Sequence, residues 1–211
     1  MKITDIETVV ITSPDKDRQE KISQMLNEKG ITNHRLIEGV FCDSFDEIET
    51  LLKQHGEHWR MVWHRIENKW GIGTWGCLLA HAKIWSMVES GEISTPCVVL
   101  EDDVEFNAEY IDFDLEMFEE YDFTTLHTKK TYGTYAYLLR GTGARKLLEN
   151  LPPKLAATPD GTIDLRIVRR KVKGLKVHRP GIKMFKHVGV PNDIESSIRL
   201  QMDAASGVPY D

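Results

Sequence analysis

The chain has 211 residues, of which 41% are hydrophobic, and its net charge at pH 7 is −6. This length fits one domain with one substantial core. Because no run approaches the ~18 to 20 apolar residues of a membrane span, the amino terminus lacks a signal-peptide layout, and three cysteines lack metal-type spacing, we expect a soluble cytoplasmic protein with reduced thiols.

The first predicted elements form a β-α-β unit. An apolar, β-branched run over 7–12 predicts a strand, and Ser13-Pro14 predicts the N-cap and first turn of the next helix. That helix should end at Gly30, and a second strand is predicted over 35–37.

The middle of the chain is predicted to be helical around one long loop. Ser44 followed by Glu47 forms a capping box for a helix that ends at Gly56. Residues 57–72 show no clean period and are interpreted as an ordered loop, a possible lid. A helix with one aromatic and apolar face should follow over 74–91.

The remaining elements continue the α/β alternation. A buried central strand is predicted over 96–100, with further strands over 123–127 and 134–139, a helix over 144–151 and a last strand near 175–178. The pattern predicts an α/β domain with a mixed, mostly parallel central sheet.

Positive charge is concentrated late in the chain. No acidic residue occurs between Asp164 and Asp193, so an anionic ligand should meet this part of the chain; a solvated surface is the alternative interpretation. The interval holds nine cations: Arg166, Arg169, Arg170, Lys171, Lys173, Lys176, Arg179, Lys183 and Lys186.

Three carboxylates, Glu101-Asp102-Asp103, directly follow the predicted central strand. They should emerge at the carboxyl edge of the sheet, where open α/β folds bind ligands. Clustered carboxylates are tolerated when a divalent cation neutralises them, and oxygen ligands suit Mg²⁺ or Mn²⁺. An acidic N-cap cluster for the following segment is the alternative.

The block Gly73-Thr74-Trp75-Gly76-Cys77-Leu78-Leu79-Ala80-His81-Ala82-Lys83-Ile84-Trp85, followed by an apolar strand and Glu101-Asp102-Asp103, resembles glycosyltransferase family 25, the bacterial lipooligosaccharide sugar transferases and their collagen-modifying relatives. The resemblance extends from Glu7 to about Ile167. The chain departs from the family pattern at Thr12, Glu38 and Ala80, where asparagine, aspartate and serine are usual.

The resemblance implies a single GT-A type, Rossmann-like, nucleotide-sugar-binding domain over 1–211. Its donor-binding half would be about 1–105 and its acceptor and catalytic half about 106–211. Asp103 is the expected first ligand of a catalytic Mn²⁺ or Mg²⁺, Glu101 supports it, and the late His187 is the expected second ligand.

A nucleoside diphosphate sugar, linked to UDP, is the expected donor. His81 also lies in the apolar arc of its helix and would equally fit a buried structural histidine, and Arg18 would equally fit an exposed position. The residues expected to bind the donor are Thr12, Arg18, Glu38, His81, Glu101, Asp102, Ser197 and Arg199.

Inverting transfer needs one base for the acceptor hydroxyl. Asp164 matches a family position and is the expected base, with Asp160 as the fallback; a helix-start acid and an ordinary Pro-Asp-Gly turn are the structural alternatives.

The nine cations favour an anionic acceptor, either a lipooligosaccharide or another glycan, or a hydroxymethylated base in DNA. The acidic overall charge and the lack of a recognisable nucleic-acid motif favour the glycan. Two other functions share the carboxylate pattern: a metal-dependent nucleotidyltransferase or phosphohydrolase, and an inactive sugar-nucleotide-binding module.

Overall fold

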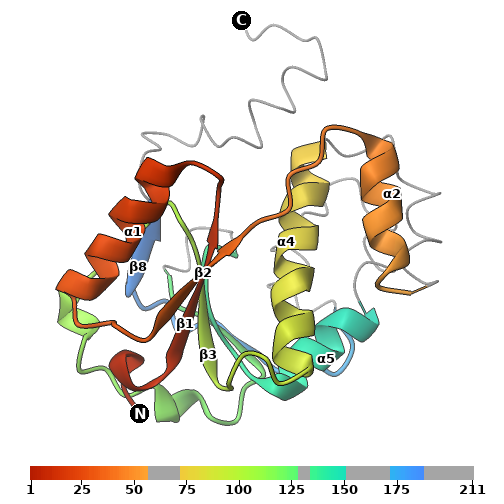
Figure 1. Cartoon of the computed structure of the whole chain (residues 1–211). Coiled ribbons are helices and arrows are strands. Elements are labelled where there is room, and N and C mark those ends of the chain that lie inside the picture. The colour runs from red at the N-terminus through yellow and green to blue at the C-terminus, as the bar shows by residue number, and fades with distance from the viewer. Residues whose placement is uncertain (57–71, 128–133, 151–171, 188–211) are drawn as a thin grey trace, which may run out of the picture.

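The computed structural model describes residues 1–56, 72–127, 134–150 and 172–187, and a six-stranded sheet in the order β2-β1-β3-β6-β5-β7 forms its centre (Figure 1). β1 pairs in parallel with β2 and β3, β6 is antiparallel to β3 and β5, and β5 is parallel to β7. The expected mixed, mostly parallel sheet is therefore confirmed. Its strands are β1 (Glu7–Thr12), β2 (His34–Glu38), β3 (Cys97–Glu101), β5 (Phe123–Thr125), β6 (Ala136–Leu139) and β7 (Val177–His178).

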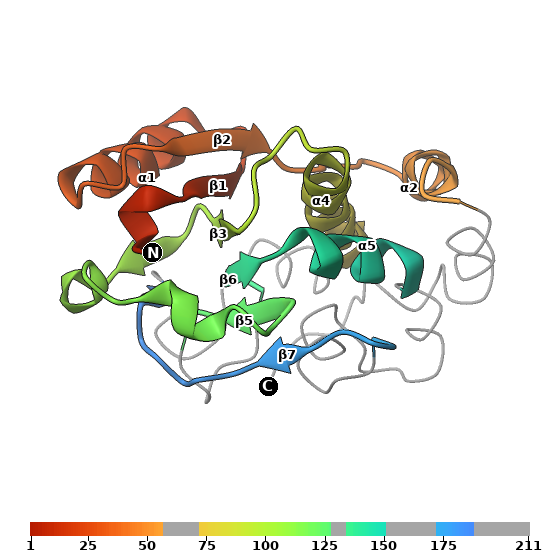
Figure 2. The same ribbon diagram turned by 90° about the horizontal axis from the view of Figure 1, so that it is seen from below.

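Helices cover both faces of this sheet, with α1 on one side and α2, α4 and α5 on the other (Figures 1 and 2). The strands are apolar on both sides: Val9 and Ile11 pack into the core beneath α4, whereas Val10 packs into the core beneath α1. None of the described helices is both long and apolar enough to cross a membrane. The helices are α1 (Lys16–Glu28), α2 (Phe45–Lys53), α4 (Ile72–Glu89) and α5 (Gly141–Asn150).

The start of α1 differs from the sequence-based expectation. Asp15, not Ser13, is the N-cap, and its carboxylate accepts hydrogen bonds from the backbone N–H groups of Asp17 and Arg18. Ser13 instead remains in the connection after β1, where it contacts the acidic strand end. At the other end of the helix, Gly30 has φ = +76°, as its predicted position after the helix requires.

A second, two-stranded sheet lies outside the main one and was not predicted from the sequence. It pairs β4 (Val104–Phe106) with β8 (Phe185–His187) in antiparallel register. The rings of Phe106 and Phe185 lie 5.2 Å apart and pack into the core beneath α1. This pairing brings His187 next to the acidic strand end, because His187 lies opposite Val104.

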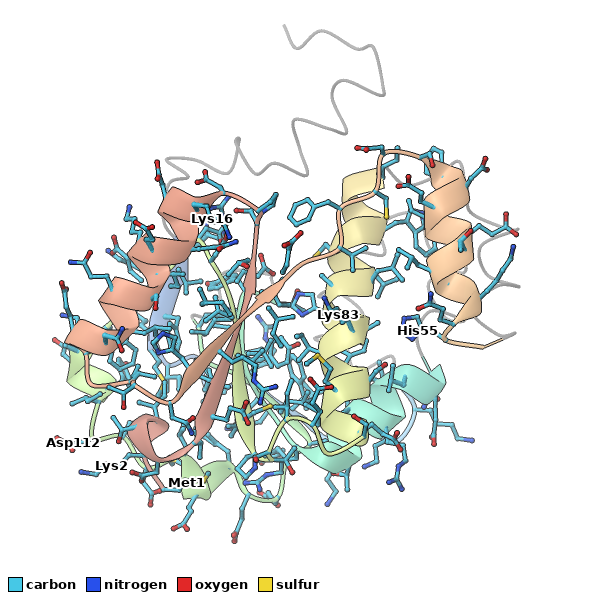
Figure 3. All side chains as sticks on the ribbon, viewed as in Figure 1. Met1, Lys2, Lys16, His55, Lys83 and Asp112 are labelled. Carbon is cyan, nitrogen blue, oxygen red and sulfur yellow. The ribbon has the colours of Figure 1, made fainter. Side chains whose placement is uncertain are left out.

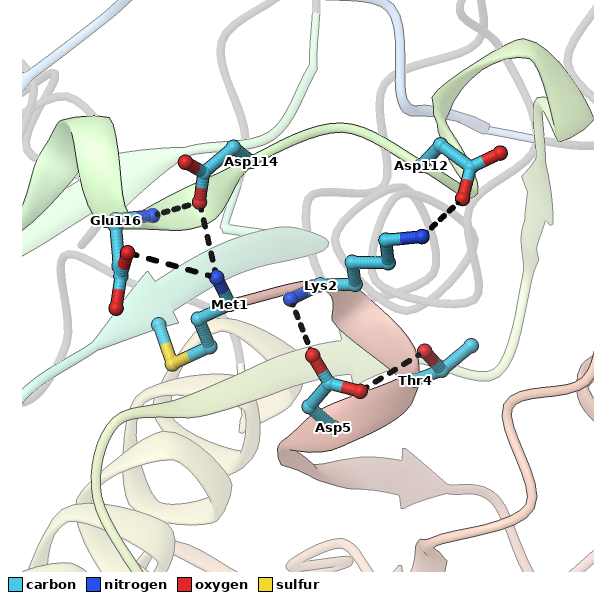
Figure 4. Close-up of polar contacts among 7 residues, drawn as sticks. All are labelled: Met1, Lys2, Thr4, Asp5, Asp112, Asp114 and Glu116. Atoms are coloured by element: carbon cyan, nitrogen blue, oxygen red, sulfur yellow. Dashed lines mark hydrogen bonds and ion pairs between the residues drawn. The ribbon is translucent and has the colours of Figure 1, made fainter.

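The amino-terminal residues are tied to the loop that follows β4. The amino group of Met1 lies 3.0 Å from Asp114 and 3.7 Å from Glu116, and the ammonium of Lys2 pairs with Asp112 (Figure 4). Figure 3 shows this cluster at the end of the molecule opposite Lys16, the first residue of α1. Three short 3₁₀ helices lie in these segments: η1 (Ile3–Asp5), η2 (Ala108–Tyr110) and η3 (Leu115–Phe118).

Candidate active site

A cavity of about 230 Å³ lies at the carboxyl edge of the sheet, where β1 and β3 end. Its walls come from four segments: the end of β1 with Arg18, the turn over 39–43, the start of α4, and the three carboxylates after β3. The acidic cluster therefore lies at the carboxyl edge of the sheet, as predicted, and it borders a cavity large enough for a ligand. The three carboxylates have different partners.

Asp102 is almost completely buried and holds the connection after β1. Its Oδ2 accepts hydrogen bonds from the backbone N–H of Ser13 at 2.7 Å and from the Ser13 hydroxyl at 2.9 Å, and its Oδ1 pairs with the guanidinium of Arg18. The side chain is 6% exposed. Asp102 therefore shapes the first β-α connection from within, and Arg18 neutralises its charge.

Asp103 faces His187 from the neighbouring small sheet. His187 Nε2 lies 3.0 Å from Asp103 Oδ2, and the Arg18 guanidinium lies 3.6 Å from the same oxygen. The hydrogen bond to Asp103 raises the pKa of His187 above its usual value, although partial burial opposes the shift. Among the described residues, Asp103 Oδ1 is buried without a hydrogen-bond partner.

This pair fits a hard divalent cation. A buried carboxylate oxygen without a hydrogen bond is costly unless a ligand satisfies it, and an aspartate with a histidine is a donor set that accepts Mn²⁺ or Mg²⁺. Asp103 and His187, predicted as two ligands of one ion, are brought together by the β4·β8 pairing.

Glu101 turns toward α4. Its Oε1 lies 3.4 Å from Nε2 of His81, and His81 Nδ1 lies 2.9 Å from the hydroxyl of Tyr137. The indole N–H of Trp85 donates to the same hydroxyl at 3.1 Å. His81 is 1% exposed, which agrees with the alternative prediction of a buried structural histidine. Its Nε2 nevertheless faces Glu101, a carboxylate that lines the cavity.

Thr12 and Glu38, which are also expected to bind the sugar-nucleotide donor, lie at the same edge of the sheet. Thr12 lines the cavity, and its backbone carbonyl accepts a hydrogen bond from Gly39 N–H at 2.9 Å. Glu38 is the register partner of Thr12 on β2, but it is exposed and does not line the described cavity. Its backbone carbonyl accepts from the ammonium of Lys83 at 3.0 Å.

Four candidates, Asp160, Asp164, Ser197 and Arg199, lie outside the described residues. The same holds for 57–71 of the predicted loop 57–72, whose last residue, Ile72, begins α4. The predicted base and the predicted late phosphate contacts therefore stay predictions.

Sequence reasoning missed three residues that shape the site. Ser13 was assigned to the helix cap, so its bond to Asp102 was not foreseen. Tyr137 looked like an ordinary strand residue, and only the pairing of β6 with β3 places its hydroxyl beneath His81. Phe41 lines the cavity yet is 57% exposed, and an aromatic residue just after a strand gave no distinct signal.

Comparison with known proteins identifies one family. The model of "Glycosyltransferase family 25 (LPS biosynthesis protein)" matches residues 8–126. A search of curated proteins found no match. Among solved structures, a glycosyltransferase involved in the glycosylation of the major capsid of PBCV-1 is similar to 96% of this chain over 100% of its own length, with 13% identity and a TM-score of 0.45. That level of likeness says nothing about individual residues.

Proposed function

The chain belongs to glycosyltransferase family 25, a family of sugar-transferring enzymes, and on this basis we propose that it moves a sugar from a UDP-linked donor to a hydroxyl of an anionic glycan, with inversion and with Mn²⁺ or Mg²⁺. The donor half would be about 1–105 and the acceptor half about 106–211. One observation carries the proposal: Asp103, with its orphaned Oδ1, lies beside His187 at the rim of the cavity.

Asp103 and His187 would hold the cation, with Glu101 in support. When bound, the cation supplies Lewis-acid neutralisation of the charge that develops on the leaving diphosphate. For this, His187 must present a neutral Nε2, so the proton that it shares with Asp103 has to leave.

The other cavity residues would bind and orient the donor. Arg18 is 36% exposed, and its charge faces the carboxylate cluster where a diphosphate would lie. Phe41 offers an exposed aromatic surface to a nucleobase. The turn that carries Phe41 is hydrogen bonded to the end of β1 through Gly39. Ser13 and Asp102 fix the backbone between these groups.

The acceptor is proposed to be anionic, such as a phosphorylated lipopolysaccharide core, because of the cations between Asp164 and Asp193 and the family's description. Of those in the described region, Lys183 and Lys186 precede His187 closely, and Lys186 pairs with Glu105 at 2.6 Å. A polyanion held by these cations should bind more weakly as salt rises.

A salt series tests this part. The acceptor KM is measured at low and moderate salt for the native chain and for a variant with Arg169, Arg170 and Lys171 changed to Gln. A steep response in the native chain alone supports an anionic acceptor, and a flat response in both contradicts it. Running glycan and hydroxymethylated DNA acceptors in parallel separates the two anionic classes.

Asp164 is proposed as the base that deprotonates the acceptor hydroxyl. Asp164→Asn should keep donor binding and lose transfer, and Asp160→Asn is the matched control. Equal loss of donor binding and transfer in Asp164→Asn would indicate a structural role instead.

A panel of sugar nucleotides with Mn²⁺, scored for release of the nucleoside diphosphate, tests the function itself. Asp103→Ala should lose metal-dependent turnover and remain folded, whereas Asp112→Ala, at an exposed carboxylate that pairs with Lys2, should match the native rate. Full activity in Asp103→Ala would refute the assignment. Release of pyrophosphate would indicate a nucleotidyltransferase, and thermal stabilisation without turnover an inactive binding module.

A further inference from the structure

A second group of metal-ligating side chains lies on the wall of the same cavity, apart from the pair formed by Asp103 and His187. Cys77, His81 and Glu101 each offer one ligand atom, and these three atoms lie within 4.8 Å of one another. Cys77 and Glu101 line the cavity, whereas His81 is buried behind them. The group joins two elements, because Cys77 and His81 belong to α4 and Glu101 ends β3.

The spacing on α4 places two ligands on one face. Residues four apart on a helix lie one above the other, so the Cys77 thiol and the His81 ring approach the strand end from the same side. Tetrahedral zinc bound at about 2.0 to 2.3 Å holds its ligand atoms roughly 3.3 to 3.7 Å apart. His81 Nε2 and Glu101 Oε1 already lie 3.4 Å apart, and no pair of the three ligand atoms needs to close by more than about 1.5 Å. The half-buried side chains of Cys77 and Glu101 can make this adjustment, since Glu101 is 27% exposed.

The donor set differs in kind from the one proposed for Mn²⁺. A thiolate and an imidazole with one carboxylate are typical of Zn²⁺, whereas Mn²⁺ and Mg²⁺ prefer carboxylate and other oxygen ligands over thiolates. We propose that Cys77, His81 and Glu101 form a Zn²⁺-selective site whose open position faces the cavity, and that Zn²⁺ bound there competes with the sugar-nucleotide donor. The competition rests on the proposed function; the metal binding does not.

The buried groups behind His81 are suited to this role. Loading releases the Cys77 thiol proton to solvent, whereas the neutral His81 ring changes tautomer: its proton leaves Nε2, where the metal binds, and Nδ1 becomes protonated. The Tyr137 hydroxyl, which already accepts from Trp85, can donate to His81 Nδ1 in the free protein or accept from Nδ1–H when the metal is bound. The ring thus keeps a hydrogen-bond partner in both states, as is usual for metal-bound histidines.

Cobalt titration of the whole chain tests the binding without any substrate. With saturating Mn²⁺ and a thiol-free reductant, Co²⁺ should bind with one-to-one stoichiometry, show sulfur-to-cobalt charge-transfer absorption, and be displaced by Zn²⁺. Cys77→Ser should abolish the absorption, and Cys42→Ser, at another cavity-lining cysteine, should keep it. Absence of the band in the native chain, or its survival in Cys77→Ser, would overturn the site.

Tyr137→Phe keeps all three ligands and gives an independent readout if Cys77→Ser does not fold. It should weaken Co²⁺ binding by roughly 10- to 100-fold, the usual effect of losing a hydrogen bond to a metal-bound histidine; unchanged affinity contradicts the arrangement.

In transfer assays with Mn²⁺, added Zn²⁺ should raise the KM for the sugar-nucleotide donor. The Zn²⁺ concentration that inhibits transfer should be at least about tenfold higher for Cys77→Ser than for the native chain, with each protein compared with its own zinc-free rate. Inhibition that is equally strong in Cys77→Ser would place Zn²⁺ elsewhere, such as at Asp103 and His187.

Discussion

Gly76→Ala should impair the enzyme more than it destabilises it. Gly76 lies near the start of α4, and a Cβ added to it would lie 2.7 Å from the backbone carbonyl oxygen of Val40. Ordinary contact begins at 3.4 Å, so the helix and the turn must separate by about 0.7 Å. Both segments are walls of the cavity.

The two free-energy effects on folding partly cancel. Alanine is favoured over glycine inside a helix by about 1 kcal/mol, whereas overpacking against a fixed backbone atom costs about 1 to 3 kcal/mol. The free energy of unfolding should therefore fall by at most about 2 kcal/mol. Catalysis is more sensitive, because a 1 Å misplacement can cost about 100-fold, so kcat/KM for the donor should fall about tenfold or more.

The assay combines urea unfolding with donor kinetics. Gly141→Ala is the matched control, because it begins α5 and its added Cβ would meet only the side chain of Thr95, at 3.6 Å. If Gly76→Ala keeps kcat/KM within twofold of the native value, the close approach of α4 to the turn does not set the donor site, and the reasoning fails.

Three further predictions concern buried polar groups. The affinity for Mn²⁺ should fall by up to about tenfold per pH unit below the raised pKa of His187, because one proton then competes with the ion; a pH-independent Kd from calorimetry contradicts this ligand. Tyr137→Phe should lower the free energy of unfolding by about 2 to 4 kcal/mol, since the ring nitrogens of Trp85 and His81 lose a buried partner; a loss under about 1 kcal/mol in urea argues against the network. Burial opposes ionisation of Asp122, but hydrogen bonds from neighbouring side chains and backbone outweigh burial and lower the pKa of this carboxyl. Ionised Asp122 therefore stabilises the fold above pH ~4, and this stabilisation is lost as the pH falls through the lowered pKa. Asp122→Asn should lack this pH-dependent loss of stability in acid unfolding.

The sequence predicted the longer strands of the main sheet well because they carry apolar runs of four to six residues. The run over 7–12 became β1 without change, and 96–100 became β3 with a shift of one residue. By contrast, β4 and β8 have three residues each, too few to show a period, and they pair across about 80 residues of chain. Strands this short form because they pair with each other, and no local sequence pattern predicts them.

In the candidate site too, features with a local sequence signal could be predicted, whereas contacts between distant segments could not be predicted from local patterns. The acidic cluster was visible because charges directly follow an apolar strand, and the likeness to a family supplied His187 as its partner. The role of Ser13 was misassigned, because a serine before a proline fits a helix cap as well as a carboxylate contact. In the structure Asp15 caps α1, and Ser13 donates its hydrogen bonds to Asp102 instead.

The three adjacent carboxylates are tolerated because each has a different partner. Glu101 meets a histidine from α4, Asp102 is saturated by Arg18 and the connection after β1, and Asp103 meets a histidine from β8. These partners come from separate elements, and the Arg18 guanidinium also lies 3.6 Å from Asp103, so the repulsion between the neighbouring carboxylates is offset locally. Among these carboxylates, Asp103 retains a buried oxygen without a hydrogen bond. A divalent cation that entered this cluster would therefore gain most at Asp103, and it would displace a proton from the adjacent histidine without breaking the bonds that hold Asp102.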